Sequence, residues 1–251
     1  MKPELELKHA VVLGLLEGLT EFLPISSTGH LILASHLLGL SHTEFLKTFE
    51  ISIQSGAILT VAILYWRRLL INIHLLILGF LPTAVIGFLL YRPIKGYLIG
   101  NDIIVVLSSI LGGILLIFLD RYKSEEGRRI KPKDAFLIGI FQSAAFVPGV
   151  SRSGAAFAGG LILGLSRRES AEFSFLLAVP TVISATIYDT LKTTEALESV
   201  HWQILIAGFT SSFIFSILGI KLMLFFAKKN ALSLFGLYRI FIGIIYGALF
   251  I

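Results

Sequence analysis

The chain has 251 residues, of which 55% are hydrophobic and only 15% are charged, and its net charge is +5. Soluble globular proteins carry about 25% charged residues, so the composition excludes an ordinary soluble domain and predicts an integral membrane protein. The positive residues gather in a few loops and form no groove with interleaved aromatic residues. We therefore expect them to meet the headgroups of membrane lipids, and we expect no nucleic-acid partner.

Cysteine is absent from the sequence, which removes disulfides, thiol chemistry and cysteine-based metal sites from consideration. The first apolar run, from Ala10, is interrupted by Glu17 and Glu21 and has no small-residue cleavage site. We therefore do not interpret it as a cleavable signal.

Two lengths of apolar stretch follow one another along the chain. Short stretches lie at 9–23, 28–40, 134–147 and 154–165, and stretches of spanning length lie at 46–66, 69–91, 103–119, 172–190, 203–226 and 234–251. The long stretches predict six transmembrane helices. The short ones cannot cross a bilayer, so each pair predicts a re-entrant helical hairpin, buried in protein or lining a wet cavity.

The two hairpins are related by a shift of 125 residues. This shift carries Gly14 to Gly139, Ser26 to Ser151, Gly29 to Gly154, and "LLGLS" at 37–41 to "ILGLS" at 162–166. Each copy, approximately 9–119 and 134–251, contains one hairpin and three spans, so the second copy must be inverted. We predict an all-α polytopic membrane protein, a single domain over 1–251, with an inverted-topology repeat and hairpin tips that meet near the midplane.

The loops differ in positive charge on the two sides of this topology. One side collects twelve lysines and arginines: Arg67, Arg68, Arg121, Lys123, Arg128, Arg129, Lys131, Lys133, Arg167, Arg168, Lys228 and Lys229. The other side has six: Lys2, Lys8, Lys47, Arg92, Lys95 and Lys192. The richer side is expected to be cytoplasmic, which turns both termini and the mouth of the first hairpin outward.

The first hairpin contains the motif "EGLTEFLPISSTGH" at 17–30. Glu17 and Glu21 are four residues apart and would project from one face of a helix, where two carboxylates suit Mg²⁺ or Ca²⁺. The alternative is that they are solvated polar residues near the outer mouth. After Pro24, one of Ser26, Ser27 and Thr28 is expected to cap a new helix, whose free amides attract phosphate.

His30 follows in the first turn of that second helix. Beside Ser27 and Glu21 we expect it to act in acid–base chemistry, although a lone buried histidine is also a common packing residue. The other histidines, His9, His36, His42, His74 and His201, have no such neighbours in the sequence and receive no role.

The second hairpin carries "PGVSRSG" at 148–154 and places Arg152 where the first copy has Ser27. Its planar guanidinium suits phosphate oxygens, and the alternative is a salt bridge to Glu17 or Glu21 that holds the hairpins together. For Arg239, in the last span, we favour a structural or headgroup-binding role.

Together the two motifs resemble the signatures of the undecaprenyl-diphosphatase family, the bacitracin-resistance proteins. The resemblance covers the whole chain and implies a phosphatase of the cell membrane that converts undecaprenyl diphosphate to the monophosphate, recycling the lipid carrier of cell-wall synthesis, with a divalent cation. Carried over by motif, the catalytic residues are Glu17, Glu21, Ser27, His30 and Arg152. We expect the other tip residues to bind substrate: Ser26, Thr28, Gly29, Ser151, Ser153 and Gly154.

In this interpretation a polyprenyl diphosphate enters from the outer leaflet and its tail stays in the lipid. Ser27 attacks the terminal phosphorus or orients the water that does, and His30 manages the proton. A secondary transporter, a flippase for the monophosphate and a membrane scaffold are the alternatives, the first because inverted repeats with broken helices are typical of transporters. The oligomeric state stays open, a homodimer included.

Overall fold

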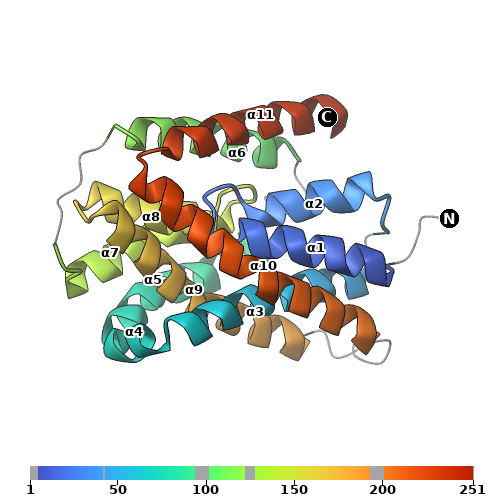
Figure 1. Cartoon of the computed structure of the whole chain (residues 1–251), viewed down its shortest axis with the longest axis horizontal. Helices are drawn as coiled ribbons and strands as arrows, with labels where there is room; N and C mark the ends of the chain where they lie inside the picture. The colour runs from blue at the N-terminus through green and yellow to red at the C-terminus, as the bar shows by residue number, and fades with distance from the viewer. Residues whose placement is uncertain (1–4, 42, 94–101, 122–127, 193–200, 251) are drawn as a thin grey trace.

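The computed structural model of the protein describes residues 5–41, 43–93, 102–121, 128–192 and 201–250 (Figure 1). Within these ranges the chain forms helices and no strand, which confirms the all-α prediction. The helices are α1 (Leu7–Thr20), α2 (Ser27–Leu37), α3 (Glu44–Leu64), α4 (Trp66–Ile71), α5 (Ile73–Pro93), α6 (Asp102–Leu119), α7 (Pro132–Gln142), the 3₁₀ turn η2 (Ser143–Phe146), α8 (Arg152–Ile162), α9 (Arg167–Lys192), α10 (Trp202–Lys228) and α11 (Leu232–Phe250).

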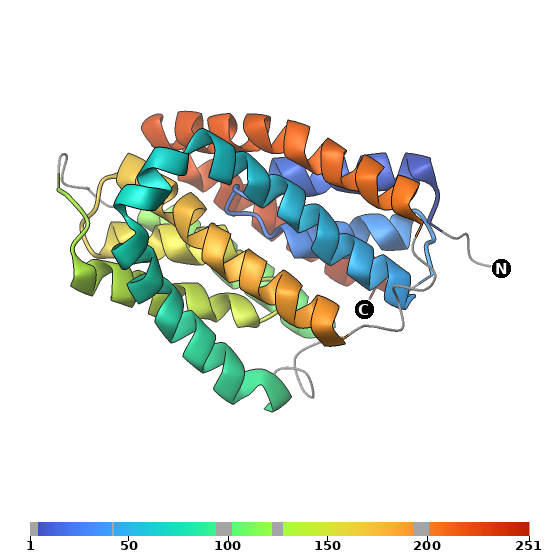
Figure 2. The same cartoon turned by 90° about the horizontal axis from the view of Figure 1, so that it is seen from below.

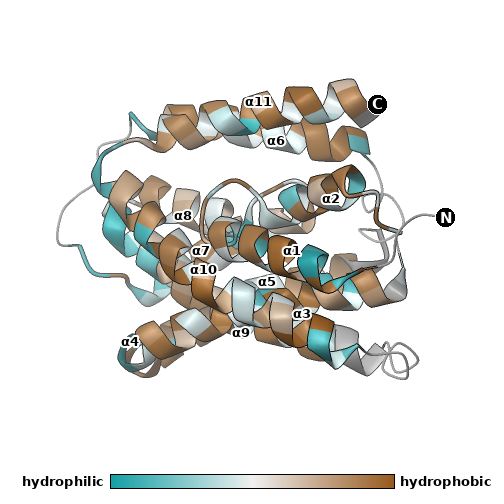
Figure 3. Cartoon of the chain, turned by 45° about the vertical axis from the view of Figure 1, so that its right-hand side comes forward, coloured by the Kyte–Doolittle hydropathy of each residue, from teal (hydrophilic) through white to brown (hydrophobic). Residues whose placement is uncertain are grey.

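Six helices in the described part of the chain are long and apolar enough to cross a membrane: α3, α5, α6, α9, α10 and α11. This confirms the predicted number of spans. Their outward faces carry many exposed leucines, isoleucines and phenylalanines, and polar residues gather toward the helix ends (Figure 3). Such a surface is stable in contact with lipid and would associate in water, so the fold agrees with a polytopic membrane protein.

The second span starts later than the prediction of 69–91. The chain first forms the short helix α4, which Tyr65 and Asn72 separate from its neighbours, and α5 begins at Ile73. The Asn72 side chain donates to the carbonyl of Arg68 at 2.9 Å and so competes with the backbone hydrogen bonds of a continuous helix. Hydropathy alone does not register this interruption because the residues around it are apolar.

The four short stretches form two helical hairpins whose tips meet inside the protein. Helices α1 and α2 run in opposite directions on either side of Pro24, and α7 and α8 do so on either side of Gly149 (Figure 1). The Ser153 hydroxyl of the second tip donates to the Leu23 carbonyl of the first at 2.9 Å. The predicted contact between the tips is therefore present, whereas their depth in a membrane stays a prediction.

Helix pairing follows the pattern that the predicted repeat requires. Helix α1 packs on α10 as its counterpart α7 packs on α5, and the equivalent helices α3 and α9 run antiparallel, side by side (Figure 2). Both hairpin contacts depend on glycine: a Cβ at Gly14 would collide with the Gly208 carbonyl of α10, and one at Gly139 with the Gly79 carbonyl of α5. Positions 14 and 139 are related by the shift of 125, so the two copies use the same close approach.

One end of the helix bundle carries the positively charged segments. The α3–α4–α5 turn, the end of α6, and the starts of α7, α9 and α11 all lie there, while α1 begins and α11 ends at the opposite end (Figure 1). Asp120 ties part of this end together, since it accepts from Arg167 at 3.0 Å and from the Leu232 amide at 3.1 Å. The described members of the twelve-residue set therefore share one end, as the predicted topology requires.

Candidate functional site

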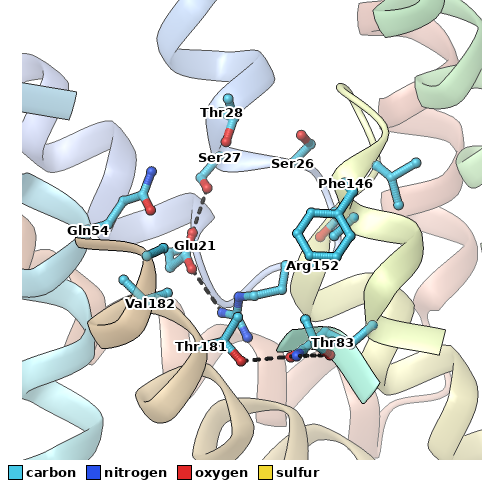
Figure 4. Close-up of a pocket in the computed structure, with 15 residues that line it drawn as sticks. Glu21, Ser26, Ser27, Thr28, Gln54, Thr83, Phe146, Arg152, Thr181 and Val182 are labelled. Carbon is cyan, nitrogen blue, oxygen red and sulfur yellow. Dashed lines mark hydrogen bonds and ion pairs between the residues drawn. The ribbon is translucent and has the colours of Figure 1, made fainter. Parts of the chain in front are cut away.

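A chain of hydrogen bonds links the two hairpin tips. The Ser27 hydroxyl donates to Glu21 Oε2 at 2.6 Å, and Arg152 Nη2 donates to Glu21 Oε1 at 2.8 Å (Figure 4). Arg152 Nη1 also donates to the Ser174 carbonyl of α9 at 3.2 Å. The salt bridge that we weighed as an alternative role for Arg152 is thus present, with Glu21 as its partner.

The backbone of the first tip sets the positions of these groups. Helix α1 ends at Thr20, Glu21 is its C-cap, and Ser26 caps α2 by accepting from the Gly29 amide at 3.4 Å. Ser26 has φ +69°, an unusual conformation for a residue with a side chain. Ser26, and neither Ser27 nor Thr28, is therefore the capping residue, which leaves Ser27 free to contact Glu21.

A cavity of about 180 Å³ opens beside this hydrogen-bond chain (Figure 4). The predicted site residues that line it are Glu21, Ser26, Ser27, Thr28, Ser151 and Arg152. Gly29 lies outside its wall, and Gly154 packs between the tips, where an added Cβ would lie 3.2 Å from Pro24. The structure therefore brings together half of the predicted substrate-binding residues and uses Ser153 and Gly154 to join the tips.

Glu17 is fully buried, and neither of its carboxylate oxygens has a hydrogen-bond partner in the described part of the chain. It lies one helical turn before Glu21, whose amide donates to the Glu17 carbonyl, and the two carboxyl groups are neighbours. Glu21 is also buried, at 8% exposure, so the alternative of two solvated acids near the outer mouth is wrong. A buried carboxylate without donors is costly and needs a proton or a cation.

His30 faces away from the cavity. Its Nδ1 lies 2.8 Å from the Ser26 carbonyl, and its Nε2 lies 2.7 Å from the Tyr238 hydroxyl of α11. The imidazole lines a separate, smaller cavity together with Gly29 and Arg239. The hydrogen bonds of His30 thus go to Ser26 and Tyr238 and not to Ser27 or Glu21. A role of His30 in proton transfer stays a prediction.

The comparison with protein families agrees with this arrangement. The model of the family described as bacitracin resistance protein BacA matches residues 10–245. The chain belongs to the BacA family. Three similar proteins are each named undecaprenyl-diphosphatase: that of Aquifex aeolicus is 53% identical and covers 97% of this chain and 98% of its own length.

Those of Thermus thermophilus and Campylobacter jejuni are each 44% identical. The first covers 97% of both chains, and the second covers 95% of this chain and 92% of its own. These similarities confirm the resemblance inferred from the two motifs, and they extend over nearly the whole chain.

The BacA-family chain also places residues in the cavity that the sequence interpretation missed. Gln142 of α7, which stands where the first copy has Glu17, donates through Nε2 to Thr83 at 3.1 Å and to Thr181 at 3.0 Å. All three line the cavity, as does Gln54 of α3. A signal was available in the sequence, because Thr83 and Thr181 each follow a proline within a predicted span, where proline removes a backbone hydrogen bond from the helix.

Arg239 of this BacA-family chain is buried and holds backbone carbonyls from three elements. Its guanidinium donates to Pro24 of the first tip at 3.1 Å and to Gly149 of the second tip at 3.0 Å. It also donates to Ser108 and Ser109 of α6, at 3.1 and 3.3 Å. These contacts favour the structural role over headgroup binding, because they lock α6 and α11 onto both tips.

A metal site of three or more His, Asp or Glu side chains is not found among residues 5–41, 43–93, 102–121, 128–192 and 201–250. The carboxyl groups of Glu17 and Glu21, which are neighbours, form a pair below that number. Such a pair is compatible with Mg²⁺, which commonly binds through one or two carboxylates and completes its shell with water and phosphate oxygens.

Proposed function

We propose that this protein is an integral membrane phosphatase that hydrolyses undecaprenyl diphosphate to undecaprenyl monophosphate and inorganic phosphate. Such a reaction recycles the lipid carrier of cell-wall synthesis, and family membership supports it together with a role in bacitracin resistance. The observation that carries the proposal is the Ser27–Glu21–Arg152 chain, which places a hydroxyl, an acceptor for its proton and a phosphate-binding cation side by side on one cavity.

Substrate binding begins, in this proposal, with an exchange of partners at Arg152. The terminal phosphate takes the guanidinium from Glu21, because two phosphate oxygens fit the planar fork as well as a carboxylate does. The Glu21 carboxylate is then free to accept a proton from Ser27, with which it already shares a hydrogen bond of 2.6 Å. Binding of the correct headgroup would thus prepare the nucleophile.

Two routes lead from this complex to the same products. In the first, Ser27 Oγ attacks the terminal phosphorus as its proton passes to Glu21, and the bond from phosphorus to the bridging oxygen breaks. Undecaprenyl monophosphate leaves, and water then hydrolyses the phosphoserine to inorganic phosphate. In the second, Ser27 orients a water molecule that attacks directly, and Glu21 accepts the proton of the water.

The charges around the cavity support a divalent cation. One cationic side chain, Arg152, faces two carboxylates, so an anionic diphosphate would meet net negative charge without a further cation. Glu17, whose oxygens lack donors in the described structure, would hold Mg²⁺ or Ca²⁺ together with the Glu21 oxygen that Arg152 releases, while the other Glu21 oxygen keeps its contact with Ser27 and accepts the proton. When bound, the cation supplies positive charge that stabilises the developing charge on the phosphate oxygens.

We also propose that the protein resides in the cell membrane and that the cavity opens to the outer side. The cavity follows α9 through Thr181, Val182 and Ala185, in the half of the helix away from Arg167 and the positive end. Cysteines placed at Ser41 and at Lys133 should react from outside and inside intact cells, respectively, with no background because the chain has no cysteine. Labelling of both from one side would contradict this topology.

The decisive experiment is phosphate release from undecaprenyl diphosphate by the purified protein in detergent, with added Mg²⁺ or Ca²⁺ and with excess chelator. We expect release with the cation and its loss with the chelator. Detergent leaves no compartment to transport into, so a transporter or flippase would bind the substrate without cleaving it. Binding without cleavage under every divalent cation tested would therefore reject the phosphatase proposal in favour of transport.

A further inference from the structure

The hydrogen bonds of His30 determine which of its nitrogens carries a proton. A backbone carbonyl can only accept, so Nδ1, 2.8 Å from the Ser26 oxygen, must carry a hydrogen in either protonation state of the ring. The one nitrogen with a free lone pair in the neutral ring is Nε2, and it accepts from the Tyr238 hydroxyl at 2.7 Å. The basic side of His30 thus faces α11, and the side that faces the tip is a donor.

The carbonyl that accepts from Nδ1 belongs to Ser26, whose backbone conformation is strained. Ser26 has φ +69°, a region that costs energy for any residue with a Cβ and persists only where the surroundings hold it. Its carbonyl accepts from both the His30 amide, at 3.2 Å, and His30 Nδ1. Two donors from one residue therefore hold the peptide that leads directly into Ser27.

The second hairpin serves as an internal comparison. Under the shift of 125, Ser26 corresponds to Ser151 and His30 to Ala155. Ser151 has φ −73°, and among the described residues its carbonyl accepts from one donor, the backbone amide of Ala155, at 2.8 Å. The N-cap serine thus has an ordinary negative φ in the copy without the histidine and a positive φ in the copy with it.

Tyr238 completes the support from the last helix. Its ring stacks on the imidazole, with centroids 5.5 Å apart and an angle of 11° between the planes, in addition to the hydroxyl contact. Stacking and hydrogen bonding together restrict the rotation of His30 and direct Nδ1 at Ser26. Arg239, which lies on the same helix and holds the Pro24 carbonyl, anchors the other side of the tip.

We infer that His30 and Tyr238 are positioning residues: they hold Ser26 in its left-handed conformation and thereby aim the Ser27 hydroxyl at the phosphate. This inference rests on the proposed phosphatase function. It assigns the proton of Ser27 to Glu21 and gives Tyr238, which the sequence interpretation did not single out, a part in the site.

Replacement of His30 by asparagine and by alanine separates positioning from proton transfer. An asparagine amide can place a donor where Nδ1 lies but cannot take up a proton, so His30→Asn should keep kcat within about fivefold while His30→Ala loses about tenfold or more. The acidic limb of the kcat/KM pH profile should be unchanged in His30→Asn. If His30 were the general base, both variants would lose about 100-fold or more and this limb would change.

Two further variants test the connection through Ser26 and Tyr238. Glycine adopts positive φ freely, so the effect of His30→Ala should be smaller in a Ser26→Gly background than in the wild-type chain. Tyr238→Phe keeps the stacked ring and loses the hydroxyl, and should lower kcat by about threefold with KM unchanged. Tyr65→Phe, at a tyrosine that does not line the cavity, serves as the control and should have the activity of the wild type.

The outcomes distinguish this inference from the proposed function. A wild-type protein that releases no phosphate contradicts the phosphatase proposal itself. An active wild type whose His30→Asn and His30→Ala variants are equally impaired, while both stay monodisperse and thermally stable, overturns the positioning role alone. Additive effects of His30→Ala and Ser26→Gly would also overturn it, because they would show that His30 does not act through Ser26.

Discussion

Arg152 of one hairpin and Glu21 of the other form a hydrogen-bonded ion pair of 2.8 Å where the two tips meet. Both side chains are largely buried, at 14% and 7% exposure, so loss of either charge would leave the other without its partner in a poorly solvated place. The pair therefore joins the two copies of the repeat in the resting protein and, in our proposal, opens when phosphate arrives.

Replacement of Arg152 by lysine should preserve the fold and abolish most of the activity. An ammonium can still pair with Glu21, but it lacks the planar donors that bind two phosphate oxygens at once. We expect kcat/KM to fall by at least about tenfold, roughly 1.4 kcal/mol of barrier, with little change in thermal stability. Turnover close to that of the wild type would reduce Arg152 to a general electrostatic role.

Replacement of Glu21 or Glu17 by glutamine tests cation binding. Each variant should lower activity by at least about tenfold and raise the concentration of Mg²⁺ or Ca²⁺ needed for half-maximal rate, because a neutral amide is a weaker ligand. Glu6→Gln, at a surface carboxylate that precedes the same helix, is the control and should titrate like the wild type. Full activity of the wild type in excess chelator would remove the cation from the mechanism.

Ser27→Ala distinguishes a nucleophile from a phosphate-binding hydroxyl. A nucleophile's loss should lower kcat by several orders of magnitude with substrate affinity nearly intact, whereas loss of a binding group mainly raises KM. Ser52→Ala, at a hydroxyl that donates to the Thr48 carbonyl within α3, is the matched control. Rapid quenching of the wild type with substrate labelled in the terminal phosphate should trap label on Ser27 if the covalent route operates, and none if water attacks directly.

Gln142 should contribute to the site through its carbonyl oxygen. Thr83 and Thr181 donate their own hydrogens to backbone carbonyls, so their oxygens accept from Gln142 Nε2, and this orients Oε1 the other way. Oε1 is buried without a partner among the described residues, so it is an unsatisfied acceptor on a residue that lines the cavity. Gln142→Leu should lower kcat/KM by about tenfold, whereas Gln203→Leu, at an exposed position, should have no effect.

Asp120 should stabilise the positively charged end in a pH-dependent manner. Burial alone would raise its pKa, but hydrogen bonds from Ser233 and Leu232 and the charge of Arg167 outweigh burial and hold the pKa below the ordinary value of 3.8. A lowered pKa means that the stabilisation is present above 3.8 and is lost as the pH falls through the folded value.

The variant Asp120→Asn should therefore melt about 2–4 °C below the wild type at pH 7. This difference should shrink as the pH falls below 3.8 and disappear below the lowered pKa of the folded state, where the wild-type carboxylate is protonated as well. Equal melting temperatures at pH 7 would show that the ion pair contributes nothing to stability. Activity measured at pH 7 and low temperature should be unchanged, because Asp120 lies remote from the cavity residues.

The sequence by itself determined the helices, the hairpins and the relation between them. Apolar runs of about 20 residues predict helices long enough to cross a bilayer, and shorter runs broken by Pro24 or by Gly149 predict hairpins, so length and composition gave the helices except for the separate helix α4. The shift of 125 relates Gly14 to Gly139, and the structure adds that both glycines make the same close approach to a neighbouring helix.

Only the tertiary structure decided which polar groups face one another. Glu17 and Glu21 lie one helical turn apart, yet of the two only Glu21 lines the cavity. Ser27 and His30 are three residues apart, yet Ser27 contacts Glu21, whereas His30 contacts Tyr238, more than 200 residues further along the chain. Helices that are apolar on every side carry no signal for the direction in which an isolated polar residue points. That direction is set by contacts between distant helices, which also bring Thr83, Gln142 and Thr181 together from three separate segments.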